Sequence, residues 1–360
     1  MKISEQSLDL AVAQGILSIE QAARLRALEA ADSGPLNEDR QDDEKLRFIG
    51  GFGDIFVTLG IALLLGSSAY FAQTNLGTGW MWAVTAGLSW LLAEFFTRRR
   101  RMALPSIALL LSFVGSAFGT FDFVFAMALP EGRPVWREGL GFLPDTTGWA
   151  VGLSALVATG LAALHYWRFR VPITVAAGAA MVSTAIIAFV LALAPDLDVR
   201  LRSALVIACG LVVFLEAMRF DMADPARVTR KTDIAFWLHL LAAPLIVQPL
   251  IFGFLGGVAN LDTPRAVGII AIFLGLGLVA VVIDRRAFLV SALAYAGFAF
   301  GALIHRSGIQ HETTPATLLA LGVFVLALSA GWRPLRHAAL LLLPETLTRR
   351  LPHPLASKTT

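Results

Sequence analysis

The sequence has 360 residues, of which 57% are hydrophobic and 15% charged, and its formal net charge is +3. A soluble globular chain carries roughly 25% charged residues, so this composition excludes a single soluble domain, and the small net charge gives no support to nucleic-acid binding. The single cysteine, Cys209, excludes an intrachain disulfide and a cysteine metal cage, and is interpreted as a small apolar side chain.

Residues 1–30 are predicted to form two short helices, a cytosolic helical hairpin outside the membrane. Gly15 is placed to end the first helix in a left-handed conformation. Ser18 and Gln21 have the spacing of a capping box, which predicts that the second helix begins there. Residues 31–47 are polar, so they are predicted to be a linker rather than part of a core.

Residues 48–333 are predicted to be an all-α, polytopic transmembrane bundle, because apolar runs of about 20 residues follow one another with short connections. About ten membrane helices are expected. Their approximate spans are 50–72, 80–97, 104–127, 148–167, 172–194, 202–220, 232–255, 265–284, 287–304 and 315–332. Residues 334–360 are predicted to be a cytosolic or interfacial tail, since the apolar stretch after Trp332 is too short to cross a bilayer.

The basic residues predict the orientation of this bundle. Most of the 29 lysines and arginines fall in connections on one side of the spans, including Arg98–Arg101 and Arg285 with Arg286. Because cytosolic loops retain positive charge, both termini are expected in the cytosol.

Two glutamates lie near the predicted cytosolic ends of their helices. Glu94 precedes Arg98 by four residues, and Glu216 precedes Arg219 by three. Both spacings favour ion pairs on a helix surface. The alternative is that the two glutamates line a cytosolic vestibule together with Asp233.

The turn before the span 232–255 carries two aspartates, Asp221 and Asp224. Paired aspartates are able to bind a divalent ion. The simpler interpretation is neutralisation by the basic residues around them, which are Arg219, Arg227, Arg230 and Lys231.

The span 232–255 contains the least expected polar group, His239, roughly 13 Å beyond Arg230 at 1.5 Å per residue. Pro244 and Pro249 have no backbone N–H, so each frees a carbonyl one turn earlier and predicts a kink. Kinked helices with polar groups line binding sites in many transporters, and here the candidates are His239 and Gln248. The simpler interpretation is a kinked helix whose His and Gln side chains bond to neighbouring helices.

Asp233 begins the same helix, where a carboxylate complements the helix dipole and can pair with Arg230 or Lys231. A proton relay between Asp233 and His239 is the functional alternative. It is disfavoured because residues six positions apart do not share a face of a straight helix.

His305, His311 and Glu312 lie in a predicted outer loop. Two interpretations of these side chains are open: they form a weak metal site, or they are simply solvated. The sequence contains no GxSxG, HExxH, P-loop or paired CxxC motif. No catalytic residue, resident metal or cofactor is therefore predicted.

The segment AVAQGILSIEQAARLRAL, followed by FIGGFGDIFVTLGIALLLG, resembles uncharacterised multi-pass bacterial inner-membrane proteins that have an N-terminal helical hairpin. The segment DPARVTRKTDIAFWLHLLAAPLIVQPL is similar to parts of the same kind of protein. The resemblance implies the bacterial inner membrane and implies no particular activity.

These observations predict a non-enzymatic membrane scaffold or sensor that is embedded in the lipid bilayer and meets a cytosolic protein through residues 1–30. The alternative is a transporter or channel for a small solute or ion, with its site beside the kinked helix 232–255.

Overall fold

The computed structural model describes residues 12–32, 52–129, 147–224, 227, 229–257, 262–306 and 313–341. The chain divides into two compact units, Met1–Gly50 and Gly51–Thr360.

The first unit contains helix α2 (Ile19–Asp32), which begins as the sequence predicts. The Ser18 N–H donates to Gln21 Oε1 at 2.9 Å, and the Gln21 N–H donates to Ser18 Oγ at 3.1 Å, which completes the capping box. Gly15 has a φ of 69°, the left-handed conformation expected at the end of the preceding helix. Most of that preceding helix, and so the predicted hairpin, lies outside the described residues.

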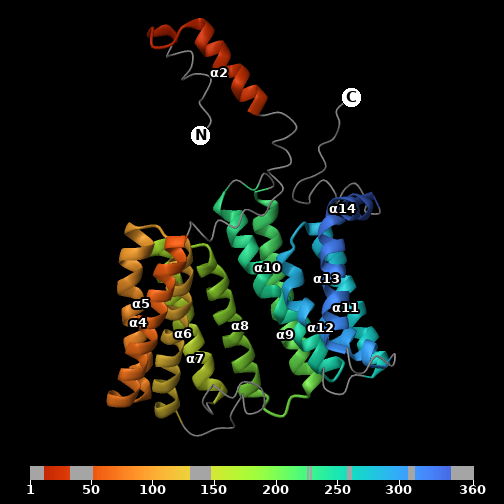
Figure 1. The fold of residues 1–360 in the computed structure, drawn as a ribbon. Coiled ribbons are helices and arrows are strands. Elements are labelled where there is room, and N and C mark those ends of the chain that lie inside the picture. The colour runs from red at the N-terminus through yellow and green to blue at the C-terminus, as the bar shows by residue number, and fades with distance from the viewer. Residues whose placement is uncertain are drawn as a thin grey trace. The chain divides into compact units, whose positions relative to one another are not determined.

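The second unit is a series of helices that run back and forth (Figure 1). Two of them are continued by short π-helical segments, η1 (Glu94–Arg99) after α5 and η2 (Leu250–Phe254) after α10. The α-helices are α4 (Phe52–Leu76), α5 (Thr78–Ala93), α6 (Ala103–Ala128), α7 (Gly148–Phe169), α8 (Ile173–Leu193), α9 (Val199–Met222), α10 (Arg230–Pro249), α11 (Thr263–Ile283), α12 (Ala287–Arg306), α13 (Thr313–Ala330) and α14 (Trp332–Leu341).

Side-chain caps fix where several of these helices begin. Thr147 Oγ1 accepts from the Ala150 N–H at the start of α7, and Asp198 Oδ2 accepts from the Arg200 N–H at the start of α9. Thr229 caps α10 in the same way. Each cap satisfies a backbone donor that the first turn of a helix leaves open.

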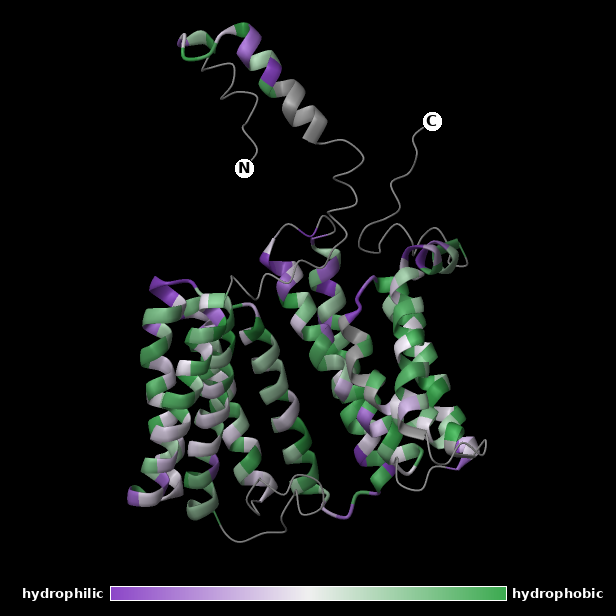
Figure 2. Cartoon of the chain, in the orientation of Figure 1, coloured by the Kyte–Doolittle hydropathy of each residue, from purple (hydrophilic) through white to green (hydrophobic). Residues whose placement is uncertain are grey.

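Seven helices within the described residues are long and apolar enough to cross a membrane. An eighth is added if α13 and α14, which meet at a bend of 65°, count as one span. Figure 2 shows the hydrophobic residues distributed along these helices. The expected total of about ten stays a prediction, because neither α5, which has only 16 residues before its π-helical continuation, nor α12 is among the seven.

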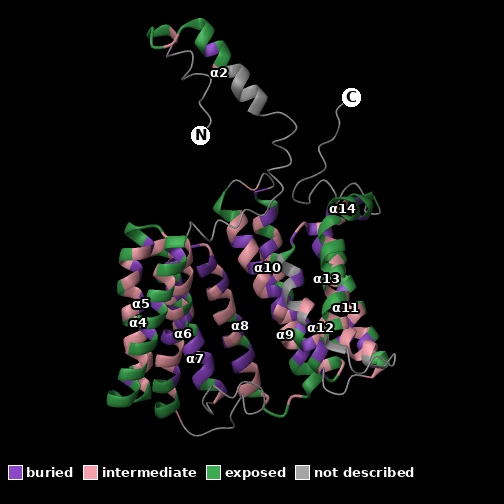
Figure 3. Ribbon diagram, viewed as in Figure 1, coloured by how far each residue is buried: buried purple, intermediate pink, exposed green. Residues whose placement is uncertain are grey.

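The helices of the second unit form two groups, α4–α8 and α9–α14 (Figure 1). The first group has two apolar clusters: Leu109 belongs to the one between α4, α5 and α6, and Leu110 and Phe113 belong to the one between α6, α7 and α8. The second group has one large cluster, which contains Leu238 and Phe273 and also includes Ala176 of α8. Helices α8 and α10 pack against each other and connect the groups. Half of the most apolar part of α7 and of α10 is buried, compared with 17% for α4, so α7 and α10 are central (Figure 3).

Candidate functional site

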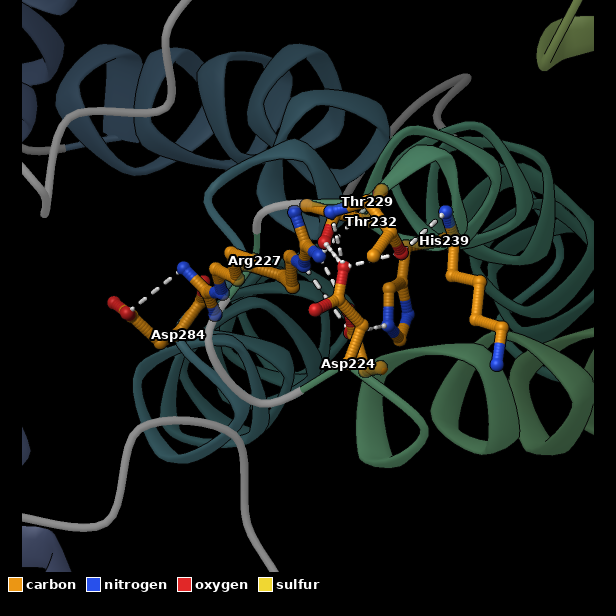
Figure 4. A network of polar contacts seen from close by, with 9 residues as sticks. Asp224, Arg227, Thr229, Thr232, His239 and Asp284 are labelled. Atoms are coloured by element: carbon orange, nitrogen blue, oxygen red, sulfur yellow. Dashed lines mark hydrogen bonds and ion pairs between the residues drawn. The ribbon is translucent and has the colours of Figure 1, made fainter. Parts of the chain in front are cut away.

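The most unusual feature of the second group is a cluster of charged and polar side chains at one end of its helices; Figure 4 shows part of it, including Asp224, Arg227, Thr229, Thr232, His239 and Asp284. We call it the charged cluster. Its members are Asp221, Asp224, Arg227, Thr229, Thr232, His239, Asp284, Arg285, Trp332 and Arg336.

Asp221, in the last turn of α9, lies at the centre of the cluster. Its Oδ2 atom is 2.9 Å from His239 Nε2 and 3.1 Å from Arg285 Nε, while Arg285 Nη2 donates to its Oδ1. Arg285 therefore binds this carboxylate with two donors, the strongest arrangement available to an arginine. The exposed fractions are 1% for Asp221, 0% for His239 and 2% for Arg285, so all three are enclosed.

The contact with Asp221 determines how the proton is placed on His239. An ionised carboxylate only accepts hydrogen bonds, so Nε2 of His239 carries the hydrogen that it donates. The imidazole also lies edge-on to the Phe214 ring, with 5.4 Å between the ring centroids. Contacts from α9 thus hold the ring of this α10 residue on two sides.

Asp284, which ends α11, has partners from two other segments, the α9–α10 turn and α14. Its Oδ2 accepts from Arg227 Nη1 at 3.1 Å and lies 3.4 Å from Arg336 Nη1, and its Oδ1 accepts from Trp332 Nε1 at 2.8 Å. Asp284 adopts a left-handed conformation with φ 57°, which aspartate tolerates better than most residues. One carboxylate therefore ties α14 and the α9–α10 turn to the end of α11.

Asp224 organises the turn that leads into α10. Its Oδ2 accepts from the backbone N–H of Thr229 at 2.7 Å, from the Thr229 hydroxyl at 2.6 Å and from the Thr232 hydroxyl at 3.0 Å. Arg285 also reaches the backbone oxygen of Thr232, at 3.5 Å. The turn is therefore held both by its own side chains and by the segment after α11.

The formal charges of the cluster cancel. Three carboxylates, those of Asp221, Asp224 and Asp284, are opposed by three guanidinium groups, those of Arg227, Arg285 and Arg336. Burial lowers the pKa of the Arg227 guanidinium, which lies in the turn outside the helices. The cluster keeps charge out of water by pairing it, as buried ions require.

The two glutamates singled out from the sequence form the ion pairs that their spacing predicts. Arg98 Nη1 is 3.2 Å from Glu94 Oε2, and Arg219 Nη1 is 2.7 Å from Glu216 Oε1. Glu94 has a second partner: Arg168 of α7 donates to both of its oxygens, at 2.8 and 3.0 Å. Neither glutamate belongs to the charged cluster.

The candidates on α10 are not gathered into one site. His239 is enclosed, whereas Gln248 is exposed and lies roughly 13 Å further along the helix. Asp233 is half-buried in the first turn. The α-helix continues through Pro244, and its geometry changes to π-helical one residue after Pro249.

The surroundings of the two turn aspartates agree in part with the expected neutralisation by Arg219, Arg227, Arg230 and Lys231. Arg227 interacts electrostatically with Asp221, but the hydrogen bonds of Asp221 are made with Arg285 and His239, and Asp224 accepts hydrogen bonds from threonines. Arg227 donates its own hydrogen bonds to Asp284. The sequence Asp284-Arg285-Arg286 indicates a charged turn. It gives no indication that Arg285, the first of its two arginines, is buried.

Where the chain is described, no group of three or more His, Cys, Asp or Glu side chains is arranged to hold a metal ion. The alternative metal site at His305, His311 and Glu312 falls outside the side chains that the structure describes.

These long apolar helices are those of a polytopic, all-helical membrane protein, with a buried and balanced set of charges in one of its two groups. No protein-family model matches the sequence, and no curated protein matches it either.

Proposed function

We propose that the chain is a non-enzymatic membrane scaffold or sensor, in which the charged cluster locks the ends of α9, α10, α11 and α14 together. The observation that carries the proposal is the state of Asp221. Both of its oxygens are engaged by side chains from two other segments, and all three residues are enclosed.

Enclosure and pairing favour a structural lock over a binding or catalytic site. A group that binds a solute and releases it must reach water during the cycle, and a general acid or base needs a reacting atom within hydrogen-bond reach. Asp221 and His239 are close enough for proton transfer to each other, but Arg285 stabilises the ionised carboxylate and opposes that transfer.

A flux measurement on the purified full-length protein tests the lock. In vesicles that carry a pH-sensitive dye, or a potassium or sodium gradient, the wild-type protein should add no flux above that of empty vesicles. Flux that is abolished by His239→Gln and kept in Glu216→Gln would replace the scaffold by a transporter, since Glu216 forms only an exposed pair.

The transporter is the second candidate, because α10 changes its helical geometry near its end, and irregular membrane helices are used at binding sites in many transporters. Helix α10 carries two internal prolines and loses regular α-helical geometry at Leu250. In this alternative, a substrate-bound state would open the contact between Asp221 and His239. The flux experiment distinguishes it from a lock that stays closed.

The first unit supports a role in recruiting a partner. Ile16 and Ile19 at the start of α2 are 70% and 77% exposed, which leaves apolar surface uncovered beside a capped helix. We place this unit in the cytosol and the bundle in a bacterial inner membrane, from the arginine distribution and the resemblance. A photo-crosslinking residue at Ile19 should then capture a specific protein in cells, and the same residue at the exposed Arg24 should capture less.

A further inference from the structure

A hollow of about 410 Å³ lies at the arginine-rich end of α5, away from the charged cluster. It is lined by Leu91, Glu94, Phe95, Arg98 and Arg99. These residues span the change from α5 into the π-helical segment η1, and such changes in helix geometry are frequent at functional sites.

The lining changes from apolar to cationic along the helix. Leu91 and Phe95 are 66% and 42% exposed, so they present apolar surface outward from the bundle. Arg98 and Arg99 follow on the same face, about 5 Å further along the axis at 1.5 Å per residue. This order matches a phospholipid, whose acyl chains lie in the apolar region and whose phosphate lies at its boundary.

The single carboxylate in the hollow is already neutralised. Arg168 donates two hydrogen bonds to Glu94 and lowers the pKa of this carboxyl group, which lies beyond the last α-helical residue of α5. Arg98 uses one nitrogen on the same glutamate and has other donors left. In the described part of the chain no carboxylate pairs with Arg99, so the hollow carries excess positive charge.

A third guanidinium lies beside the hollow. The Cζ atom of Arg100 is 5.6 Å from the centre of the Phe95 ring, within cation–π range. Arg98, Arg99 and Arg100 therefore follow directly where the apolar surface of Leu91 and Phe95 ends.

We propose that this hollow binds the phosphate of an anionic phospholipid through Arg98 and Arg99, with an acyl chain along Leu91 and Phe95. Basic residues at the membrane boundary attract anionic headgroups, with each arginine contributing about a fivefold gain in affinity. The apolar side chains in the lining favour a lipid over free phosphate, which would leave Leu91 and Phe95 without a partner.

The test uses the full-length protein in mild detergent, titrated with phosphatidylglycerol or phosphatidylcholine and read by native mass spectrometry. We expect wild-type protein to prefer phosphatidylglycerol, and Arg98→Gln with Arg99→Gln to weaken that binding by about 25-fold. The double lysine variant keeps the charges and should retain most of the affinity. Arg219→Gln, which removes an arginine from a similar exposed pair, should not change it.

Three results would overturn the proposal: unchanged phosphatidylglycerol binding in the double glutamine variant, an equal loss in Arg219→Gln, or displacement of the lipid by millimolar inorganic phosphate. If the glutamine variant does not fold, a photoactivatable phosphatidylglycerol on the wild-type protein decides the matter. Its crosslinks should map to residues 91–99, and crosslinks found elsewhere would refute the site.

Discussion

The two helix groups of the membrane unit differ in how their buried ionisable residues are arranged. In α4–α8 these residues are scattered, with Asp54 on α4, Asp122 on α6 and His165 on α7. In α9–α14 they converge on Asp221 and Asp284. The first group is therefore held mainly by packing, whereas the second adds a balanced set of charges that link helices far apart in the sequence.

Close packing in the first group depends on small and aromatic residues. A Cβ atom added to Gly148 would come within 2.7 Å of the Ala188 carbonyl oxygen, so α7 and α8 approach each other at backbone distance. His165 lies among three aromatic rings, those of Trp90, Phe113 and Phe169. None of these contacts depends on an ion pair between helices.

Packing contacts are many and individually weak, so a substitution in the first group should cost an amount set by local volume. A buried charge that loses its partner is penalised by its whole desolvation. Substitutions in the second group should therefore have larger effects, and the effects should be coupled.

Asp221→Asn tests the cost of a buried charge that loses its partner, and the largest change in the free energy of unfolding is expected for it. The asparagine keeps the shape but leaves the Arg285 guanidinium buried and uncompensated, which should lower the free energy of unfolding by about 3–5 kcal/mol. Denaturant titration in detergent micelles measures this free energy of unfolding.

Glu216→Gln is the matched control for Asp221→Asn, because it removes a carboxylate from an exposed pair on the same helix. Its effect should stay below about 1 kcal/mol. Asp221→Leu combined with Arg285→Leu should be less damaging than the sum of the two single changes. Equal losses in Asp221→Asn and Glu216→Gln would contradict the larger contribution assigned to the buried charges of the cluster.

The sequence predicted those parts of this comparison that depend on neighbours along one helix. The pairs of Glu94 with Arg98 and of Glu216 with Arg219 follow from positions three or four apart, because helical geometry alone brings these side chains together. The capping box of Ser18 and Gln21 was predictable for the same reason.

The charged cluster was not predictable in this way. Asp221 and Arg285 are 64 positions apart, and Asp221 and His239 are 18 apart, so their contact depends on how α9, α10 and α11 pack. Apolar helices pack in many arrangements of similar composition, and hydropathy does not choose between them. The sequence did single out His239 as a residue that needs a partner, but it could not name Asp221.

Trp332→Phe tests whether α14 is tied to the cluster. The phenylalanine keeps an aromatic ring but loses the N–H that donates to Asp284 Oδ1 at 2.8 Å. A hydrogen bond to a charged group contributes about 1.5–3 kcal/mol, so unfolding should become easier by that amount, and amide exchange in α14 should become faster.

The control is Trp167→Phe on α7, where the side chain is 76% exposed and stability should change little. Unchanged amide exchange in α14 of Trp332→Phe would separate this helix from the lock. Arg336, which also pairs with Asp284, would then be the residue that holds α14.

Gly148→Ala tests the packing of the first group. The new methyl group would meet the Ala188 carbonyl oxygen, which is backbone and cannot move aside cheaply, so a loss of about 1–3 kcal/mol is expected. Gly160→Ala on the same helix adds its methyl group in open space and should be neutral or slightly stabilising, because alanine favours helix. Thermal unfolding of the two variants should move in opposite directions, and a shared loss would mean that glycine flexibility matters more than close approach.

The smallest effect is expected for Glu94→Gln, which removes the one interhelical ion pair described for the first group. This carboxylate is 32% exposed, so the pair with Arg168 should contribute less than about 1 kcal/mol at neutral pH. Arg168, the main cause, lowers the pKa of Glu94 below its ordinary value of 4.5. A depressed carboxyl pKa stabilises the folded state above the unfolded pKa, and that stability is lost as the pH falls through the folded value.

Wild-type protein and Glu94→Gln should therefore differ by a constant amount from about pH 7 to about pH 5, and should converge in more acidic buffer. Arg219→Gln, which breaks an exposed pair without an interhelical partner, provides the reference curve. A difference that grows as the pH falls would mean that the carboxyl group is better accommodated when protonated. The ion pair with Arg168 would then not be the reason why Glu94 stabilises the contact between α5 and α7.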